Sequence, residues 1–221
     1  MEIPVLRNIL SANDAIARRN RERLDKQGIL AINIMSSPGS GKTSLILQTI
    51  NHFKSKARVA VIEGDVASRI DADKVSQQGA PVVQINTDGG CHLEANMTAN
   101  ALDNLPLEQI DLLLIENVGN LICPAGFALG EDKKVTLLSM PEGDDKPYKY
   151  PTIFVESDVV LVNKIDLLPY LDFNLEAFKK AVTGLNDKVR ILSVSCKTGE
   201  GLEAWFSWVE REIGKKKKRH R

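Results

Sequence analysis

The sequence predicts an α/β fold, with one domain built on a mostly parallel central sheet of about seven strands and helices on both faces. Short, nearly all-apolar runs such as ILAINIM (29–35) and DLLLIEN (111–117) recur along the 221 residues. Helical patterns fall between most of these runs. Strands that are apolar on both faces are typical of parallel sheets covered by helices. No internal repeat or low-complexity linker divides the chain, and its length suits a single core.

The elements are expected in a regular order. A broken apolar stripe over 4–27 predicts one or two amphipathic helices before the first strand. The later strands are expected at 58–64, 81–86, 111–117, 134–140, 158–164 and 189–195. The later helices are expected at 42–56, 68–79, 91–104, 174–183 and 200–213. The proline-rich segment 141–152 reads as an exposed loop. The expected division is a helical segment 1–27, a nucleotide-binding domain 28–213 with an embedded metal site, and a basic tail 214–221.

Composition excludes several classes of protein. Hydrophobic residues make up 43% of the chain and charged residues 26%, which is ordinary for a globular protein. No apolar run approaches the roughly 18 residues of a membrane span, and the first residues do not form a signal peptide. Three cysteines suit a reducing cytoplasm better than a disulfide framework. We therefore expect a cytoplasmic protein that needs no membrane.

The last seven residues, KKKKRHR, carry six Lys or Arg and no acid, although the whole chain has 29 basic and 29 acidic residues. A solvated, disordered tail is the favoured interpretation. An electrostatic hook for nucleic acid or an acidic partner is the alternative, and nothing else in the sequence indicates nucleic-acid binding.

A phosphate-binding loop follows the first predicted strand. Residues 36–43 read SSPGSGKT, which matches the P-loop pattern except for Ser36 at its first position. Glycines let backbone N–H groups face a phosphate at a helix N-terminus. Lys42 would reach the β- and γ-phosphates, and Thr43 would bind Mg²⁺. A plain connecting turn is the alternative, and the flanking strand and helix favour a P-loop NTPase domain. The candidate nucleotide-binding residues here are Gly39, Ser40, Gly41, Lys42, Thr43 and Ser44.

Guanine is the base that the motif NKID, Asn163–Asp166, predicts at the end of the sixth strand. The Asp166 carboxylate can accept hydrogen bonds from both N1–H and the exocyclic amine of guanine, and adenine offers no such pair. Lys164 would lay its methylenes along the base. The next strand ends in SCKTG (195–199), so we expect backbone N–H groups of Ser195, Cys196 and Lys197 to close over the guanine. Cys196 is expected to be structural.

Two acidic residues are candidates for the magnesium site. Asp65 follows the second strand and Glu116 ends the fourth, so either can hold Mg²⁺ together with Thr43, directly or through water. Gly119 would let the backbone approach the γ-phosphate. An N-cap or loop carboxylate is the other interpretation of each acid. We expect Lys42, Asp65 and Glu116 to be catalytic.

A small G protein has D-x-x-G and then a glutamine that orients water. This chain has Glu116 and Asn120 at those places, which predicts slow intrinsic hydrolysis.

A cysteine and a histidine stand side by side in TDGGCHLEA (87–95). Cys91 and His92 fall at a turn before a predicted helix, where neighbouring side chains can converge. Cys123 follows the fourth strand, so all three can reach the nucleotide edge of the sheet. Thiolate and imidazole suit Ni²⁺, Zn²⁺ or Cu⁺. Three ligands leave a tetrahedral site open, which permits a labile metal or one shared across a dimer. Because lone Cys and His are more often core residues, the residues alone leave both interpretations open.

Together these motifs resemble the HypB family of hydrogenase nickel-incorporation GTPases, which is grouped with the signal-recognition and urease accessory GTPases. The resemblance runs from Asn13 to Trp208 and rests on PGSGKT, EGD (63–65), TDGGCHL (87–93), ENVGNLICP (116–124) and NKID. It implies a homodimer, promoted by GTP and metal, that works with the accessory protein HypA. The implied task is nickel insertion into the [NiFe]-hydrogenase large-subunit precursor. The resemblance also implies a nickel or zinc site at Cys91, His92 and Cys123, and so favours the metal interpretation.

Three other interpretations explain less of the sequence. A urease-type accessory GTPase would share the nucleotide motifs but carry a Cys-Pro-His motif, which is absent here. A zinc- or nickel-storage protein with a regulatory or vestigial nucleotide site would not need Lys42, Thr43 and Asp166. A P-loop kinase would have no use for NKID. Some relatives have a Cys- or His-rich amino terminus, but no Cys or His precedes His52, so nickel storage of that kind is not expected.

Overall fold

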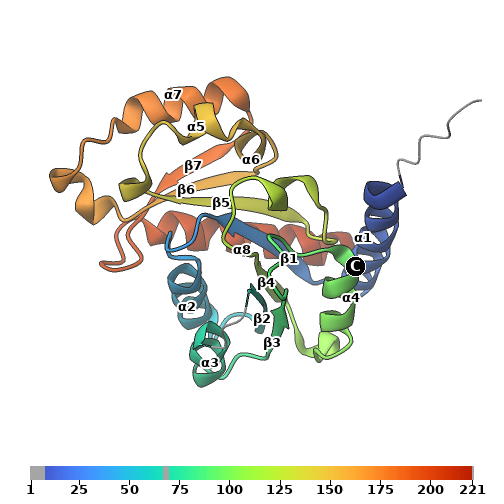
Figure 1. The fold of residues 1–221 in the computed structure, drawn as a ribbon. Helices are drawn as coiled ribbons and strands as arrows, with labels where there is room; N and C mark the ends of the chain where they lie inside the picture. The colour runs from blue at the N-terminus through green and yellow to red at the C-terminus, as the bar shows by residue number, and fades with distance from the viewer. Residues whose placement is uncertain (1–7, 67–69, 221) are drawn as a thin grey trace, which may run out of the picture.

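The computed structural model describes residues 8–66 and 70–220. Seven strands form one sheet in the order β3-β2-β4-β1-β5-β6-β7, and every pairing is parallel (Figure 1). The predicted fold class is therefore confirmed. The strands are β1 (Leu30–Ser36), β2 (Val59–Asp65), β3 (Val82–Asn86), β4 (Leu112–Glu116), β5 (Lys133–Ser139), β6 (Val159–Asn163) and β7 (Arg190–Ser193).

Helices cover both faces of the sheet (Figure 1). One face packs on α2 (Lys42–Phe53), α3 (Ile70–Gln77) and α8 (Leu202–His220). The other packs on α1 (Asn8–Lys26) and α4 (Ala95–Leu102) at one end and on α6 (Pro151–Val155) and α7 (Leu175–Leu185) at the other. The remaining short elements are α5 (Lys146–Lys149), η1 (Leu107–Gln109), η2 (Cys123–Gly126), η3 (Met140–Glu142) and η4 (Ile165–Tyr170).

Strand β1 shows why the apolar runs form this sheet. All seven of its residues are buried. Successive side chains point to opposite faces, so Ile32 and Ile34 enter the core of one face, while Ala31 and Met35 enter the two separate cores of the other face. Asn33 is the polar exception, and it is fully buried between the two cores on the second face. Because all strands run parallel, the loops that follow them meet at one edge, where ligands of such sheets bind.

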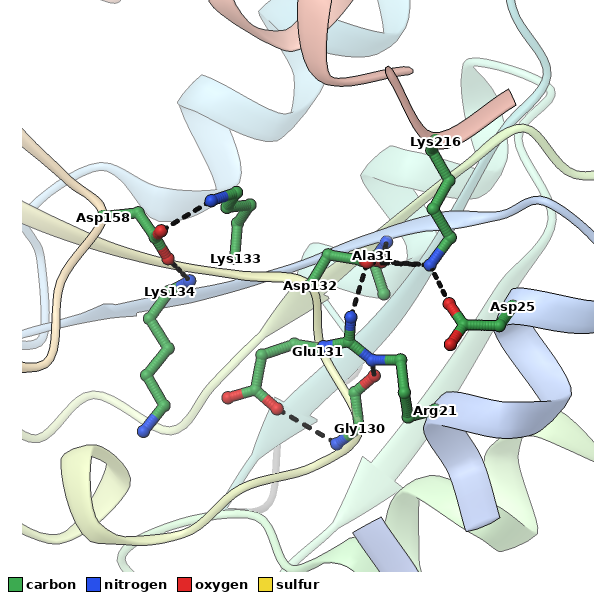
Figure 2. A network of polar contacts seen from close by, with 10 residues as sticks. All are labelled: Arg21, Asp25, Ala31, Gly130, Glu131, Asp132, Lys133, Lys134, Asp158 and Lys216. Atoms are coloured by element: carbon green, nitrogen blue, oxygen red, sulfur yellow. Dashed lines mark hydrogen bonds and ion pairs between the residues drawn. The ribbon is translucent and has the colours of Figure 1, made fainter. Parts of the chain in front are cut away.

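The basic carboxyl terminus is helical, so the predicted disordered tail at 214–221 is wrong up to His220, the last described residue. Lys216 is only 7% exposed. Its ammonium group binds Asp25 of α1 and both carboxylate oxygens of Asp132, at 2.7 and 2.9 Å (Figure 2). Lys217 forms an ion pair of 2.9 Å with Asp111. Counting charges along the sequence could not show that acidic partners lie beside this helix.

Three aspartates organise the opposite, amino-terminal edge of the sheet. Asp111, Asp132 and Asp158 stand just before β4, β5 and β6. Each accepts a backbone N–H from the start of a neighbouring strand, and each binds a cationic side chain. Figure 2 shows the contacts of Asp132 and Asp158. The N–H groups belong to Arg58, Ala31 and Lys134 at 2.8, 2.9 and 2.9 Å, and the cations include Arg58, Arg21 and Lys133. These contacts satisfy backbone groups at the strand ends and fasten α1 and α8 to the sheet.

The amino-terminal segment packs as part of the domain. Leu24 of α1 is fully buried in the core shared with α4. Asn13 accepts a hydrogen bond from Ala95 N (2.8 Å), and Asn20 donates to Ala95 O (2.8 Å) and Leu129 O (2.9 Å). Helix α1 therefore holds the start of α4, close to the Cys-His turn. The predicted helical residues 4–7 and 68–69 lie outside the described residues.

The segment 141–152 is not the exposed loop that its prolines suggested. It forms most of η3, all of α5 and the start of α6, with Pro147 buried. Proline suits the first turn of a helix, where its missing N–H costs nothing. Among the described residues, no helix combines the length and the hydrophobicity that a membrane span needs.

Candidate nucleotide and metal sites

The P-loop connects β1 to α2 in the conformation that its glycines allow. Gly39 and Gly41 have φ angles of 72° and 102°, in the left-handed region that favours glycine. A Cβ on Gly41 would lie 2.5 Å from Asn163 Nδ2, so no larger residue fits. Lys42 is nearly buried, and its ammonium group donates to Ser36 Oγ at 3.1 Å. Ser36, the departure from the P-loop pattern, therefore helps to orient the lysine.

A cluster of acidic side chains lies beside the P-loop. Thr43 Oγ1 donates to Glu116 Oε1 at 3.1 Å, and Lys42 Nζ lies 4.0 Å from the same oxygen. Glu116, Glu63 and Asp71 bring carboxylate oxygens within 4.8 Å of one another. Of the described side chains, Glu63 and Glu116 each keep one buried oxygen without a hydrogen-bond partner. Carboxylate oxygens with free lone pairs are ligands that suit Mg²⁺, so the residues fit that ion.

Two of these buried carboxyl groups have raised pKa values. Burial, assisted by the neighbouring Glu116 carboxylate, raises the pKa of Glu63 to about 10. Burial also raises the pKa of Glu116, against the opposing effect of Lys42. The two carboxyl groups therefore hold a proton that a bound divalent cation would replace.

Asp65, the other predicted magnesium ligand, lies at the end of β2, where its carboxylate accepts a hydrogen bond from Val66 N at 2.6 Å. It does not belong to the cluster of three carboxylates, and its role as a ligand stays a prediction. Sequence reasoning missed Glu63 and Asp71. The available signal was Glu63 itself, an acid that directly follows the apolar run Val59–Ile62 of β2.

The predicted guanine-binding residues lie together where β6 and β7 end. Asn163 donates from Nδ2 to Ser40 O (2.8 Å) and accepts from Cys196 N (3.1 Å), so one side chain joins the P-loop to the SCKTG loop. Lys164 has a φ of 64° and donates from Nζ to Gly39 O at 2.7 Å. Asp166 accepts from Ser195 Oγ at 2.6 Å, which orients its carboxylate.

The SCKTG loop is shaped by its own hydrogen bonds. Thr198 N donates to Ser195 Oγ (3.1 Å), and Gly199 N donates to Ser195 O (2.9 Å). Cys196 N donates to Asn163 Oδ1, and the use of this loop's N–H groups on the guanine stays a prediction. Lys197 is exposed. The Cys196 side chain is buried in the core, and burial raises the pKa of its thiol to about 12, which fits its expected structural role.

Glu142 is a further residue of the nucleotide site that the sequence did not reveal. Its Oε1 accepts hydrogen bonds from Ser40 Oγ (2.8 Å), Ser139 N (2.7 Å) and Ser139 Oγ (2.8 Å). The capping box that η3 forms therefore extends to the P-loop. Ser44, also predicted to bind nucleotide, is exposed in the first turn of α2.

Cys91, His92 and Cys123 lie together, as predicted. Their sulfur and nitrogen atoms lie within 4.8 Å of one another, with Cys91 Sγ 3.4 Å from His92 Nδ1. A hydrogen bond to Cys123 raises the pKa of Cys91. The His92 ring packs on Phe127 with ring centres 3.9 Å apart, and its buried Nε2 has no hydrogen-bond partner among the described residues. Two sulfurs and an imidazole nitrogen can bind a soft or borderline metal ion.

The loop that follows β4 reaches both sites. A Cβ on Gly119 would lie 2.9 Å from Pro38 N, so the loop lies directly against the P-loop. Asn120 Oδ1 accepts from Ile122 N (2.7 Å) and Cys123 N (3.4 Å), which caps the turn that presents Cys123. The residue that replaces a water-orienting glutamine therefore shapes the loop that carries Cys123.

The fold and site define a P-loop nucleotide-binding protein with a thiol-imidazole cluster beside its nucleotide site. Residues 30–193 match the family model described as the CobW/HypB/UreG nucleotide-binding domain. The chain is 49% identical over 208 residues to the hydrogenase maturation factor HypB of Rhizobium leguminosarum bv. viciae, covering 94% of this chain and 70% of that protein.

Two solved HypB structures have the same fold as this chain. The HypB crystal structure from Archaeoglobus fulgidus has a TM-score of 0.87 at 38% identity, covering 92% of this chain and all of that one. The Helicobacter pylori HypB structure, described as a complex with nickel, has a TM-score of 0.88 at 38% identity, covering 92% and 96%. The chain belongs to the HypB family of hydrogenase maturation factors.

Proposed function

We propose that this protein is a GTP-hydrolysing metallochaperone that assists nickel insertion into the [NiFe]-hydrogenase large-subunit precursor. The observation that carries the proposal is the single loop after β4. It begins next to Glu116, which contacts Thr43, and it ends at Cys123, which lies with Cys91 and His92. The nucleotide and the metal therefore act on the same segment. The nickel complex of the Helicobacter relative supports nickel as the cargo.

In the hydrolysis reaction, the P-loop N–H groups and Lys42 bind the phosphates and stabilise the charge that develops on them. Mg²⁺, held by Thr43 and Glu116 with Asp65 or the neighbouring acids, would neutralise phosphate oxygens. Asp166 selects guanine. Asn120, which is engaged in the turn before Cys123, is not free to orient water as a glutamine would. Intrinsic turnover is therefore slow, well below the roughly 10 per second typical of enzymes.

The metal cargo binds Cys91, His92 and Cys123. Three ligands leave a coordination position open, which favours exchange over permanent storage. Nickel is the cargo, and Zn²⁺ can use the same ligands. The working form is a homodimer, promoted by GTP and metal, with a HypA-type accessory protein and the hydrogenase precursor as partners. Three free cysteines suit a reducing cytoplasm.

Nickel titration of four variants tests the proposal. Cys91→Ala, His92→Ala and Cys123→Ala should each weaken nickel binding and leave GTP affinity nearly intact, because other residues contact the nucleotide. Cys196→Ser is the matched control, since its thiol is buried in the core and should not affect nickel stoichiometry. Equal nickel binding by wild type and the first three variants would contradict the metallochaperone function.

GTP hydrolysis is measured on wild type and on Lys42→Ala. Lys42→Ala should abolish GTP hydrolysis, because a charge that faces the β- and γ-phosphates is removed. A wild-type protein that binds nickel but never hydrolyses GTP would instead be a storage protein with a regulatory nucleotide site.

A further inference from the structure

We propose that Asn117 is the residue that couples the nucleotide site to the Cys91–His92–Cys123 cluster. The inference rests on the proposed function and assigns its regulation to one side chain. Asn117 is fully buried directly after β4, and its hydrogen bonds reach none of the predicted ligands. Burial of an amide costs free energy unless its donor and acceptor groups are paired, so the partners of Asn117 indicate its role.

The Asn117 amide joins two loops. Its Oδ1 accepts hydrogen bonds from Leu93 N (3.1 Å) and Val118 N (3.0 Å). Leu93 follows His92 directly, and Val118 belongs to the loop after Glu116. Two backbone donors identify the oxygen side of the amide, since the NH₂ group cannot accept. The orientation of the side chain is therefore determined by its partners.

The other end of the amide is anchored in the sheet. Asn117 Nδ2 donates to Asn33 Oδ1 (3.1 Å), and Asn33 Nδ2 donates to Glu131 Oε1 (3.3 Å). Glu131 Oε2 accepts from Leu129 N and Gly130 N at 2.7 and 3.0 Å. The carboxylate can only accept, so the side-chain amides of Asn117 and Asn33 both donate in its direction. This network explains the polar residue in the middle of β1.

Leu93 also contacts the other nucleotide-site strand. Its side chain is fully buried against Gly64 of β2, where an added Cβ would come within 2.8 Å of the leucine. Gly64 lies between Glu63 and Asp65. Leu93 is thus held by the ends of both β2 and β4, the two strands that supply the acidic residues of the nucleotide site.

Asn117 and the loop after β4 link both halves of the Cys91–His92–Cys123 cluster to the nucleotide site. A shift of residues 117–119 with nucleotide state carries Cys123 along the same loop. Through Asn117 it also pulls Leu93 and the adjoining Cys91–His92 pair. Both halves of the cluster then respond together. Without the Asn117 amide only Cys123 would follow, and nickel affinity would lose most of its dependence on the nucleotide.

The coupling is measured as the ratio of nickel dissociation constants with GDP and with a non-hydrolysable GTP analogue, on the full chain. Wild type should show a ratio of about fivefold or more in one direction, the range of typical couplings. Asn117→Ala should bring the ratio to within about twofold of unity while nickel and GTP still bind. By reciprocity, nickel should shift nucleotide affinity by the same factor in wild type and not in the variant.

Ser157→Ala is the control, because Ser157 is a buried polar residue whose side-chain hydrogen bonds reach Thr136 and Ile153 and neither the loop after β4 nor the Cys91–His92 turn. It should lose stability but keep the wild-type ratio. If Asn117→Ala does not fold, Asn117→Ser is used in its place, because the serine side chain is too short for its hydroxyl to reach both Leu93 N and Asn33 Oδ1.

A wild-type ratio retained in the Asn117 variant would overturn the coupling role. Equal nickel affinity of wild type with GDP and with the GTP analogue would also overturn it. If nickel binding and GTP hydrolysis were intact in that case, the proposed function would still hold. Failure of wild type to bind nickel at all would overturn both.

Discussion

At the scale of single residues, several side chains of the site serve two partners at once. Asn163 binds the P-loop through Ser40 O and the SCKTG loop through Cys196 N. Glu142 joins Ser40 to Ser139. Each of these side chains fixes the position of a phosphate- or base-binding loop relative to the sheet. Their substitution should therefore disturb binding geometry more than charge.

Base choice is tested at Asp166. Asp166→Asn should change the preferred nucleotide from GTP to XTP, because an amide can donate to the extra carbonyl of xanthine where the carboxylate could only accept. GTP affinity should fall by about 10- to 100-fold, as expected when a polar group at the base is left unpaired. Binding of both nucleotides is measured by competition. A variant that loses GTP without gaining XTP would argue against Asp166 as the base-reading residue.

At the scale of elements, helices α1 and α8 are fastened to the amino-terminal edge of the sheet by charge (Figure 2). The Asp132 carboxylate accepts a hydrogen bond from Ala31 N and forms ion pairs with Arg21 and Lys216. Lys216 also binds Asp25 of α1. One carboxylate therefore joins β1, α1 and α8. The last two turns of α8 are ordered by these partners and not by an apolar face alone.

Removal of the Lys216 ammonium group tests this fastening. Lys216→Ala should lower the free energy of unfolding by about 1–3 kcal/mol, because Asp25 and Asp132 lose a nearly buried partner while Arg21 still compensates Asp132. Lys218→Ala is the control, since Lys218 is exposed on the same helix; it should change stability by less than about 0.5 kcal/mol. The measurement is chemical denaturation. Equal effects of the two substitutions would mean that the ion pairs contribute nothing to stability.

Asp111 links stability to pH. Hydrogen bonds from Arg58 and, to a lesser extent, Lys217 lower the pKa of Asp111 in the folded protein. A lowered folded pKa adds stability above the unfolded value of about 3.9 and loses it as pH falls below that value. Asp111→Asn should therefore cost about 1 kcal/mol at pH 7, a modest figure because Arg58 is largely exposed. The cost should shrink at pH 3. A cost independent of pH would contradict the ionic origin.

At the scale of the whole molecule, the two edges of the sheet have different roles. The amino-terminal edge is closed by ion pairs, whereas the carboxyl edge carries the P-loop, the NKID motif and the Cys91–His92–Cys123 cluster. Ile122, next to Cys123, is 64% exposed. An exposed apolar side chain at this place would be covered in the proposed dimer if the Cys91–His92–Cys123 cluster faces the second copy.

Oligomeric state is the corresponding prediction. Nickel should promote dimers if the cluster is shared across a two-fold axis, because a ligand bound only by the dimer shifts the equilibrium by mass action. Cys91→Ala should remove the effect, and Cys196→Ser should retain it. Light scattering with and without nickel, in GDP and in a GTP analogue, measures the molar mass. Nickel-independent mass in wild type would exclude a shared site.

The sequence by itself determined what depends on contiguous residues. The P-loop, NKID and the Cys-His pair are short segments whose chemistry is written in adjacent positions, and apolar runs define buried strands wherever they occur. Parallel strands then bring the loops that follow them to one edge. For this reason the fold class, the nucleotide site and the meeting of Cys91, His92 and Cys123 could be predicted without coordinates.

Only the tertiary structure decided which distant polar groups meet. Glu142 reaches Ser40 across 102 positions, Asn117 reaches Asn33 across 84, and Lys216 reaches Asp132 across 84. The order of strands in the sheet and the packing of helices against it set these contacts. A local sequence pattern carries no information about strand order or helix packing. Lys216 is therefore interpreted as a solvated charge from the sequence, although it is a buried ion-pair partner in the fold.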